Sequence, residues 1–152
     1  MEEIKNSTVS LLPFLEYAVK IDAPVIIVVG AASYHGNAEK IDLCDGWIRL
    51  LDAVDTNWIV LTKIEVVTFE RTTNIDKLIK VLKSSPRPVK TTKLAFTDIL
   101  TDLVDKAISI QVHGEVFDGI LSFYDRRRGI IMLTDTTGYH IINQRSIDVV
   151  YN

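Results

Sequence analysis

Hydrophobic residues recur at helical spacing in two stretches of the chain and at strand spacing in most of the remainder. The helical stretches are residues 7–20 and 96–107, which precede similar runs of short apolar segments. Apolar positions three and four residues apart lie on one face of a helix, so both stretches predict amphipathic helices. The face residues are Leu11, Phe14, Leu15 and Ala18 in the first, and Ile99, Leu100, Leu103 and Val104 in the second.

Five short β-strands are predicted after the second helix. They span residues 108–112, 116–125, 129–135, 138–143 and 146–151, and polar or glycine turns separate them. Short strands joined by tight turns pair as antiparallel neighbours. An open sheet of this size leaves exposed edges, so five such strands close most economically into a small barrel.

The same pattern occurs twice, at an offset of 83 residues. Residues 22–67 align with residues 105–150 without a gap, with thirteen identities in 46 positions. Two glycines match (Gly36 with Gly119, Gly46 with Gly129), and so do several aspartates at fixed spacing. Chance agreement between two strand-rich segments would place its matches among isoleucine and valine, so the pattern indicates an internal repeat. Glycine in the middle of the long second strand is expected where a barrel strand bends.

A basic bridge joins the repeats. Residues 71–93 carry seven Lys or Arg and one Asp, so their net charge is +6 and the rest of the chain is near −9. Within the bridge, residues 75–83 predict a short helix, and the prolines of SSPRPVK then stop it. The predicted organisation is a first repeat at 7–70, a basic linker with a short helix at 71–95, and a second repeat at 96–152.

Composition is that of a folded, soluble protein. Hydrophobic residues make up 47% of the 152 residues, and no apolar run reaches the roughly 18 residues that a membrane span needs. The beginning of the chain, MEEIKNSTVS, lacks the basic start and apolar core of a secretory signal. Since a single cysteine, Cys44, allows no intrachain disulfide and no cysteine zinc cage, we expect a cytoplasmic protein without a membrane association.

Both repeats resemble the Sm-like superfamily, which includes the Sm, LSm and Hfq proteins. The resemblance lies in a helix, five strands, a glycine in the bent second strand, an aspartate that closes this strand and an apolar third strand. The matching positions in the second repeat are Val112, Gly119, Asp125, Gly129, Ile130, Ile131, Leu133, Ile142, Ile147 and Val149. Those in the first are Val29, Gly36, Asp42, Gly46, Trp47, Ile48, Leu50, Ile59, Ile64 and Val66. The fold that it implies is mainly β: two tandem five-stranded antiparallel barrels of the Sm-like or SH3-like kind, each preceded by an α-helix.

The base-contacting residues of the family are mostly absent. Gly129 and Gly46 stand where the family has an asparagine, and Asn143-Gln144 and Val60-Leu61 stand where it has Arg-Gly. The resemblance therefore implies no base-specific pocket in either repeat.

Arg126, Arg127 and Arg128 occupy the turn after the bent strand of the second repeat. In the family this turn lines the nucleic-acid face of a ring, so the resemblance implies that these arginines hold phosphates with little sequence preference. The other candidate contacts are Asn143, Arg145, Lys77, Lys80, Lys83 and Lys90. Alternatively, the turn is a solvated loop whose arginines pair with acids such as Asp118 and Asp125.

Catalysis, metal binding and cofactor binding find no support in the sequence. His35, His113 and His140 have no matched nucleophile or acid in sequence, and neither common nucleotide-binding loop motif occurs. Asp42, Asp45, Asp52 and Asp55 could hold a cation but are more typical of turns. Aromatic side chains such as Trp47 and Trp58 could stack on bases, although core or subunit contacts are the more usual role.

The leading hypothesis is a non-enzymatic, ring-forming protein that binds RNA through a basic face. Three chains would give a ring of six barrels, and other numbers are open. The alternative is an oligomeric protein-interaction scaffold of the same fold that binds no nucleic acid, which the acidic sequence pI of about 5.6 favours.

Overall fold

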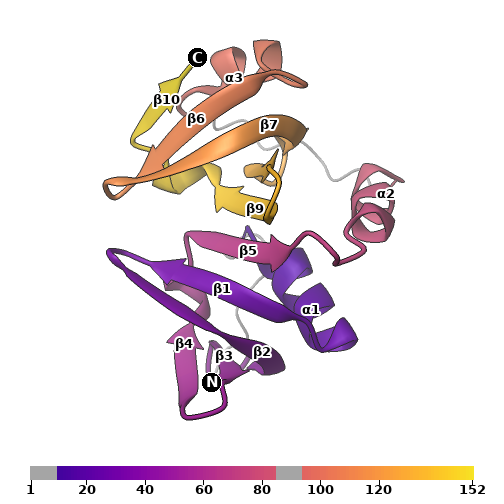
Figure 1. The fold of residues 1–152 in the computed structure, drawn as a ribbon, viewed down its shortest axis with the longest axis vertical. Helices are drawn as coiled ribbons and strands as arrows, with labels where there is room; N and C mark the ends of the chain where they lie inside the picture. The colour runs from indigo at the N-terminus through magenta and orange to yellow at the C-terminus, as the bar shows by residue number, and fades with distance from the viewer. Residues whose placement is uncertain (1–9, 85–93) are drawn as a thin grey trace.

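The computed structural model describes residues 10–84 and 94–152. Figure 1 shows the first repeat in the lower part of the molecule and the second in the upper part, with the helix of the bridge at one side. Lys90, and the prolines that were predicted to stop the bridge helix, lie outside the described residues. Among the helices of the described part, none is long and apolar enough to cross a membrane.

The first repeat consists of one helix and five strands. Helix α1 begins at Leu12, after a turn at Ser10 and Leu11, and so starts later than predicted. It buries Phe14, Leu15 and Ala18 of the predicted face together with Leu12, and Leu11 is buried just before it. Asp22, in a left-handed conformation, ends the helix and donates its N–H to the carbonyls of Ala18 and Val19. The elements are α1 (Leu12–Ile21), β1 (Pro24–Val29), β2 (Ala32–Asp42), β3 (Trp47–Leu51), β4 (Thr56–Val60), the 3₁₀-helix η2 (Leu61–Lys63) and β5 (Val66–Glu70).

The second repeat has the same order of elements. It comprises α3 (Thr97–Asp102), β6 (Ala107–Val112), β7 (Glu115–Asp125), β8 (Ile130–Thr134), β9 (Gly138–Asn143), the 3₁₀-helix η3 (Gln144–Ser146) and β10 (Val149–Tyr151). The predicted helix of the bridge is α2 (Asp76–Ser84), which buries Leu78, Ile79 and Leu82. The mainly β class, the strands of each repeat and the helix before each are therefore confirmed.

Two predicted boundaries of the second repeat are also wrong. Helix α3 ends at Asp102 rather than at residue 107, because Asp105 takes a left-handed conformation and donates its N–H to the Leu121 carbonyl at 2.7 Å. The last strand begins at Val149 rather than at residue 146. Gln144 starts η3 instead, and its buried side chain donates to the Ala95 carbonyl and lies 3.1 Å from the Thr97 hydroxyl. Polar contacts thus shorten both elements.

The ten strands of the described residues form one antiparallel open sheet. The strand order is β10-β6-β7-β8-β9-β5-β1-β2-β3-β4, so each repeat contributes five adjacent strands in an equivalent order. Two separate closed barrels were expected, whereas hydrogen bonding here runs from one repeat to the next. The link is β5 with β9, paired from Val66↔Ile142 to Glu70↔Gly138. Figure 1 shows these two strands where the repeats meet.

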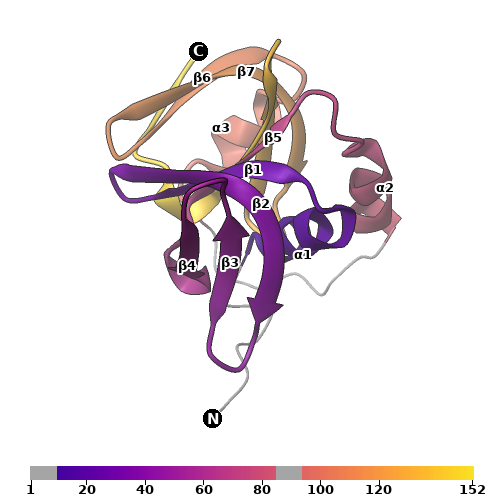
Figure 2. The same cartoon turned by 60° about the horizontal axis from the view of Figure 1, so that its bottom comes forward.

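Each repeat bends its long second strand over a glycine. A Cβ at Gly119 would lie 2.7 Å from the Thr134 carbonyl oxygen, and one at Gly36 would lie 2.8 Å from that of Leu51. Any other side chain would collide with the backbone of the next strand, so the glycine permits the close approach. The register shifts a few residues further along β2 and β7, between Ala38 and Lys40 and between Leu121 and Phe123. Figure 2 shows the resulting curvature of β2.

The buried residues form two clusters, and both cross the boundary between the repeats. The cluster under α1 and α2 includes Phe123 and Met132 from the second repeat. The cluster under α3 includes Val28 and Val66 from the first. Residues of β5 alternate between the clusters, since Val67 joins the first and Val66 the second. Strand β5 therefore contributes side chains to both cores.

Candidate functional site

The arginine turn joins β7 to β8 and is shaped by Asp125. One carboxylate oxygen of Asp125 accepts the backbone N–H groups of Arg127 and Arg128, both at 3.1 Å. The other accepts Nη1 of Arg128 at 2.5 Å, and both side chains of this ion pair are only 9% exposed. Arg126 and Arg127 are exposed. The turn thus directs two arginines toward solvent and folds the third back onto its own aspartate.

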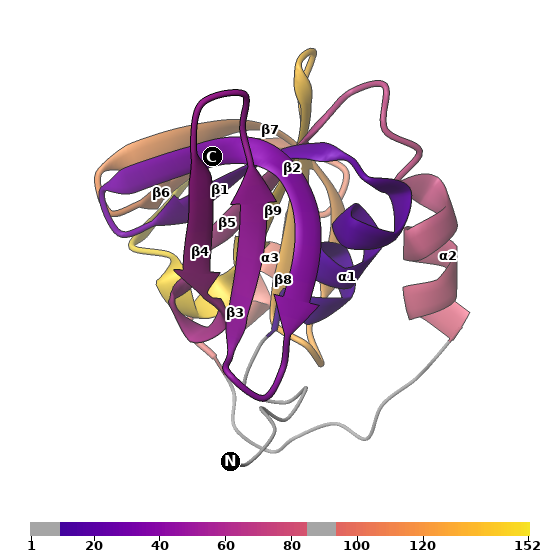
Figure 3. The same ribbon diagram turned by 90° about the horizontal axis from the view of Figure 1, so that it is seen from below.

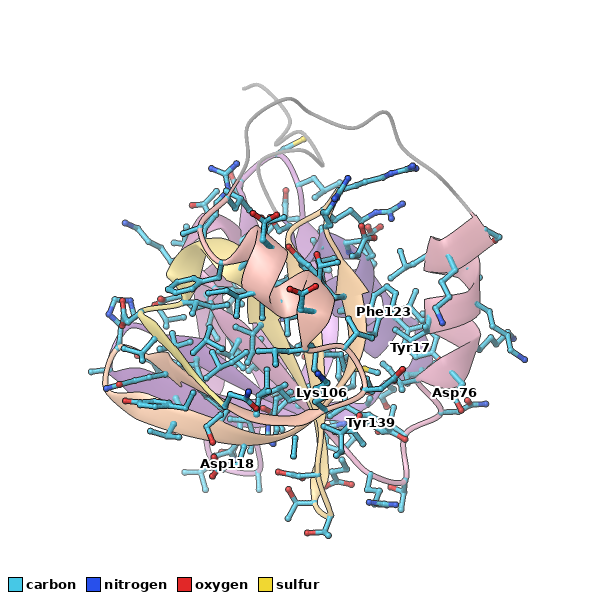
Figure 4. All side chains as sticks on the ribbon, turned by 90° about the horizontal axis from the view of Figure 1, so that it is seen from above. Tyr17, Asp76, Lys106, Asp118, Phe123 and Tyr139 are labelled. Carbon is cyan, nitrogen blue, oxygen red and sulfur yellow. The ribbon has the colours of Figure 1, made fainter. Side chains whose placement is uncertain are left out.

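The C-terminal end of α2 lies beside this turn. The Lys83 ammonium is 5.9 Å from the centre of the Phe123 ring, a distance at which a cation is attracted to an aromatic face. Figure 4 labels Phe123 next to α2. Lys83, Arg126 and Arg127 line one shallow groove of about 360 Å³, and we call these three residues the basic surface. Positive charges from two segments that are far apart in sequence, the end of α2 and the arginine turn, therefore lie together at the basic surface.

The remaining candidate residues that the structure describes lie around the basic surface or along α2. Lys77 and Lys80 are exposed on α2. Ile130 pairs with both Asp125 and Asn143, so Asn143 and Arg145 are at the same end of the sheet as the arginine turn. The Asn143 side chain accepts the N–H of Arg145 and thereby caps η3, while the Arg145 side chain is exposed. Asn143 thus has a structural partner already.

The equivalent turn of the first repeat has the same framework without the charge. The Asp42 carboxylate accepts the N–H of Asp45 at 2.9 Å, and Gly46 has the same left-handed backbone as Gly129. Between them lie Leu43 and Cys44 in place of arginines. Cys44 is exposed, and within the described residues no group of three or more His, Cys, Asp or Glu is arranged to hold a metal ion.

A polar chain crosses the boundary between β5 and β9. His140 Nε2 lies 2.7 Å from a carboxylate oxygen of Asp135, and His140 Nδ1 lies 2.9 Å from the Thr68 hydroxyl oxygen. Because a carboxylate only accepts hydrogen bonds, Nε2 of His140 carries the proton. In the neutral ring, Nδ1 then accepts a hydrogen bond from the Thr68 hydroxyl. A second polar link joins His113 Nε2 to a Glu65 carboxylate oxygen at 2.5 Å. These side chains hold the two repeats in register.

Asp135 is the charged centre of that chain. Burial raises the pKa of Asp135, but hydrogen bonds from the Thr137 hydroxyl, from His140 and from the backbone N–H groups of Thr137 and Gly138 outweigh this effect. The pKa of Asp135 therefore lies well below its usual range. Glu65, Thr68 and Asp135 were not predicted from the sequence to be functional. The partners of Glu65 and Thr68 lie in the other repeat, and the contact of Asp135 with His140 depends on the geometry of the turn between β8 and β9.

Within residues 10–84 and 94–152, the two end strands of the sheet each pair with one neighbour only, and both are partly apolar. Strand β4 forms one edge, where Trp58 is 58% exposed and Val60 is 52% exposed. Strand β10 forms the other edge, where Tyr151 is 47% exposed. Figure 3 shows β4 at the margin of the sheet, on the side away from α2. Unpaired edges with exposed apolar side chains readily accept another strand.

Comparison with the models of known protein families, with curated proteins and with solved structures finds no match to this chain.

Replacing Asp135 by asparagine should weaken the boundary between the repeats. At pH 7 we expect the free energy of unfolding to fall by roughly 1 to 3 kcal/mol, the usual cost when a charged group that accepts several hydrogen bonds is removed. A carboxyl whose folded pKa is depressed stabilises the fold above its unfolded pKa of about 3.9, and this contribution is lost as the pH falls below that value. Urea unfolding between pH 7 and 2 measures both effects.

In Asp135→Asn the loss of stability between pH 5 and 2 should be shallower than in the wild type. The control is Asp102→Asn, which removes an exposed carboxylate from α3. If the free energy of unfolding fell with pH equally steeply in the wild type and in Asp135→Asn, the role assigned to this carboxylate would be contradicted.

Proposed function

We propose that this chain is a structural subunit of a homo-oligomer with an Sm-like architecture, in which copies join head to tail through β4 and β10. One observation carries the proposal: the chain already contains one such junction, the pairing of β5 with β9. The free edges β10 and β4 are the repeat equivalents of these two strands. Each repeat, with its strands in the order of an open five-stranded barrel, would then act as one unit of the assembly.

The 83-residue offset specifies the register of the second junction. Inside the chain, Val67 pairs with Ile141 and Val66 pairs with Ile142. The 83-residue offset converts these pairs into the pairs expected between copies. Val150 of one copy would pair with Trp58 of the next, and Val149 with Ile59. Ile141 is fully buried, whereas Trp58 is 58% exposed. Pairing would cover Trp58 and satisfy the outward-facing backbone groups of both edges.

The two edges of a chain differ, so the contact is head to tail rather than two-fold symmetric. Head-to-tail contacts close into a ring when the rotation between neighbours allows it, and otherwise extend as a filament. The resemblance of both repeats to the Sm-like superfamily favours closure. Three chains would give a ring of six barrels, and other numbers are open.

Trp58→Glu tests the assembly. A glutamate at the centre of β4 would be buried beside β10 of the next copy without a partner, so we expect the variant to be monomeric where the wild type is oligomeric. The side chain is exposed in the single chain, so the fold should be retained. Light scattering after size exclusion measures the absolute mass.

Val81→Glu is the matched control, because Val81 is 53% exposed on α2, away from both edges. It should assemble as the wild type does. A wild-type protein that stays monomeric up to high concentration would overturn the proposal.

RNA binding is the second candidate function, and the basic surface favours it. Lys83, Arg126 and Arg127 gather on one face although the chain as a whole is acidic, with a net charge of −3. Each repetition of the subunit would bring another copy of this surface into the same assembly. Clustered cations of this kind bind phosphates with little sequence preference. Arg128 is committed to Asp125, so the binding residues proposed here are Arg126, Arg127 and Lys83, with Arg145 nearby.

The double variant Arg126→Glu/Arg127→Glu tests this function. We expect its affinity for a labelled single-stranded oligoribonucleotide to fall at least about tenfold at low salt, because two attractive charges become repulsive. The slope of log affinity against log salt should flatten by about 0.7 for each phosphate that the variant no longer binds. Fluorescence anisotropy at several salt concentrations measures both quantities.

Lys40→Glu/Lys106→Glu is the control, since it makes the same change of charge at exposed lysines outside the basic surface. If the Arg126→Glu/Arg127→Glu variant binds RNA as tightly as the wild type, the basic surface is not the binding site. A wild type that binds no RNA would favour the protein scaffold of the alternative hypothesis.

A further inference from the structure

Two equivalent grooves lie over the two bent glycines. The first, of about 460 Å³, runs over Gly36 between β1, β2 and β5. The second, of about 420 Å³, runs over Gly119 between β6, β7 and β10. The lining residues correspond through the 83-residue offset: Val25, Asn37, Leu51 and Thr68 in the first, and Ile108, Ile120, Thr134 and Tyr151 in the second.

The Gly36 groove is completed by a loop from the other repeat. Thr137, from the loop between β8 and β9, is part of its lining. The pairing of Glu70 with Gly138 carries this loop to the end of β5. The Thr137 carbonyl accepts the N–H of Arg71 at 3.0 Å, and Arg71 Nη1 donates to the Asp135 carbonyl at 2.9 Å. One repeat thus inserts its loop beside the groove of the other.

The Gly119 groove lacks such a loop, because it lies beside the free edge β10. Its lining includes Ile120 and Tyr151, which are 44% and 47% exposed. The repeat equivalent of Thr137 is Val54, in the loop between β3 and β4. Val54 is 87% exposed, the highest value among the exposed large hydrophobic side chains of the described residues. An apolar loop tip and an apolar groove are therefore both uncovered in the single chain.

The two loops have similar backbone contacts. The N–H of Asp135 donates to the Gly138 carbonyl at 3.1 Å, and the N–H of Asp52 donates to the Asp55 carbonyl at 2.9 Å. The Asp135 carboxylate accepts the N–H of Thr137, as the Asp52 carboxylate does that of Val54, although the latter bond is longer at 3.4 Å. The Val54 loop therefore has a backbone shape similar to that of the Thr137 loop.

We infer that Val54 of one copy packs into the Gly119 groove of the next, so that the site beside β10 is completed only by a second copy of this chain. This inference rests on the proposed head-to-tail assembly and adds the side-chain contact that selects the neighbour. In place of the polar Thr137 contact inside the chain, the contact between copies buries valine against Ile120 and Tyr151. Removal of these apolar groups from water would strengthen the junction.

Two variants test it, one on each side of the contact. Val54→Glu damages the loop and leaves the groove intact, whereas Ile120→Glu damages the groove and leaves the loop intact. Both side chains are exposed in the single chain, so each variant should fold as the wild type does, which circular dichroism and urea unfolding check. We expect each variant alone to associate at least about tenfold more weakly than the wild type, because a charge would be buried without a partner.

Mixing the two variants gives the decisive result. Val54 of the Ile120→Glu chain can enter the intact groove of the Val54→Glu chain, and no further intact junction can form. The mixture should therefore contain a species of twice the 17.1 kDa chain mass that neither variant forms alone. If the wild type assembles and both variants assemble equally well, the loop contact is overturned while the assembly stands. A monomeric wild type overturns both.

Discussion

The backbone pairing of β5 with β9 holds the two repeats together and determines where each core lies. It turns two five-stranded repeats into one ten-stranded sheet and places β5 between the two cores, with Val67 on one side and Val66 on the other. Side chains secure the same boundary through Thr68, His140 and Asp135. A repeat separated from its partner would expose an apolar strand edge, so each repeat depends on a neighbour for its stability.

This dependence connects the fold with the proposed assembly. The internal junction satisfies one edge of each repeat and leaves the two outer edges, β4 and β10, with exposed Trp58 and Tyr151. The outer edges carry a different set of side chains. Tyr151 and Asn57 stand where the internal junction has Thr68 and His140, and Gly30 stands where it has His113. The proposed contact between copies would therefore have fewer charged links than the internal junction.

The repeat, the strand content and most helix positions could be predicted from the sequence, because these depend on local spacing and on glycines with a steric role such as Gly119. The pairing of β9 with β5 could not, since strand periodicity says which face is buried and not which edge pairs. Arg126, Arg127 and Arg128 are also alike in sequence. Only the turn geometry separates them, because Asp125 binds Arg128 and leaves the other two exposed. The polar chain through His140 was missed because its members come from both repeats.

If the proposed assembly is correct, β4 and β10 pair with each other between copies as β9 and β5 do within one. Hydrogen–deuterium exchange of the β10 amides that face away from β6, measured from dilute to concentrated protein, detects this pairing directly. We expect these amides, and the outward-facing amides of β4, to become protected as the concentration rises, while β5 and β9 are protected throughout. Rapid exchange at both edges at every concentration would contradict the pairing between copies.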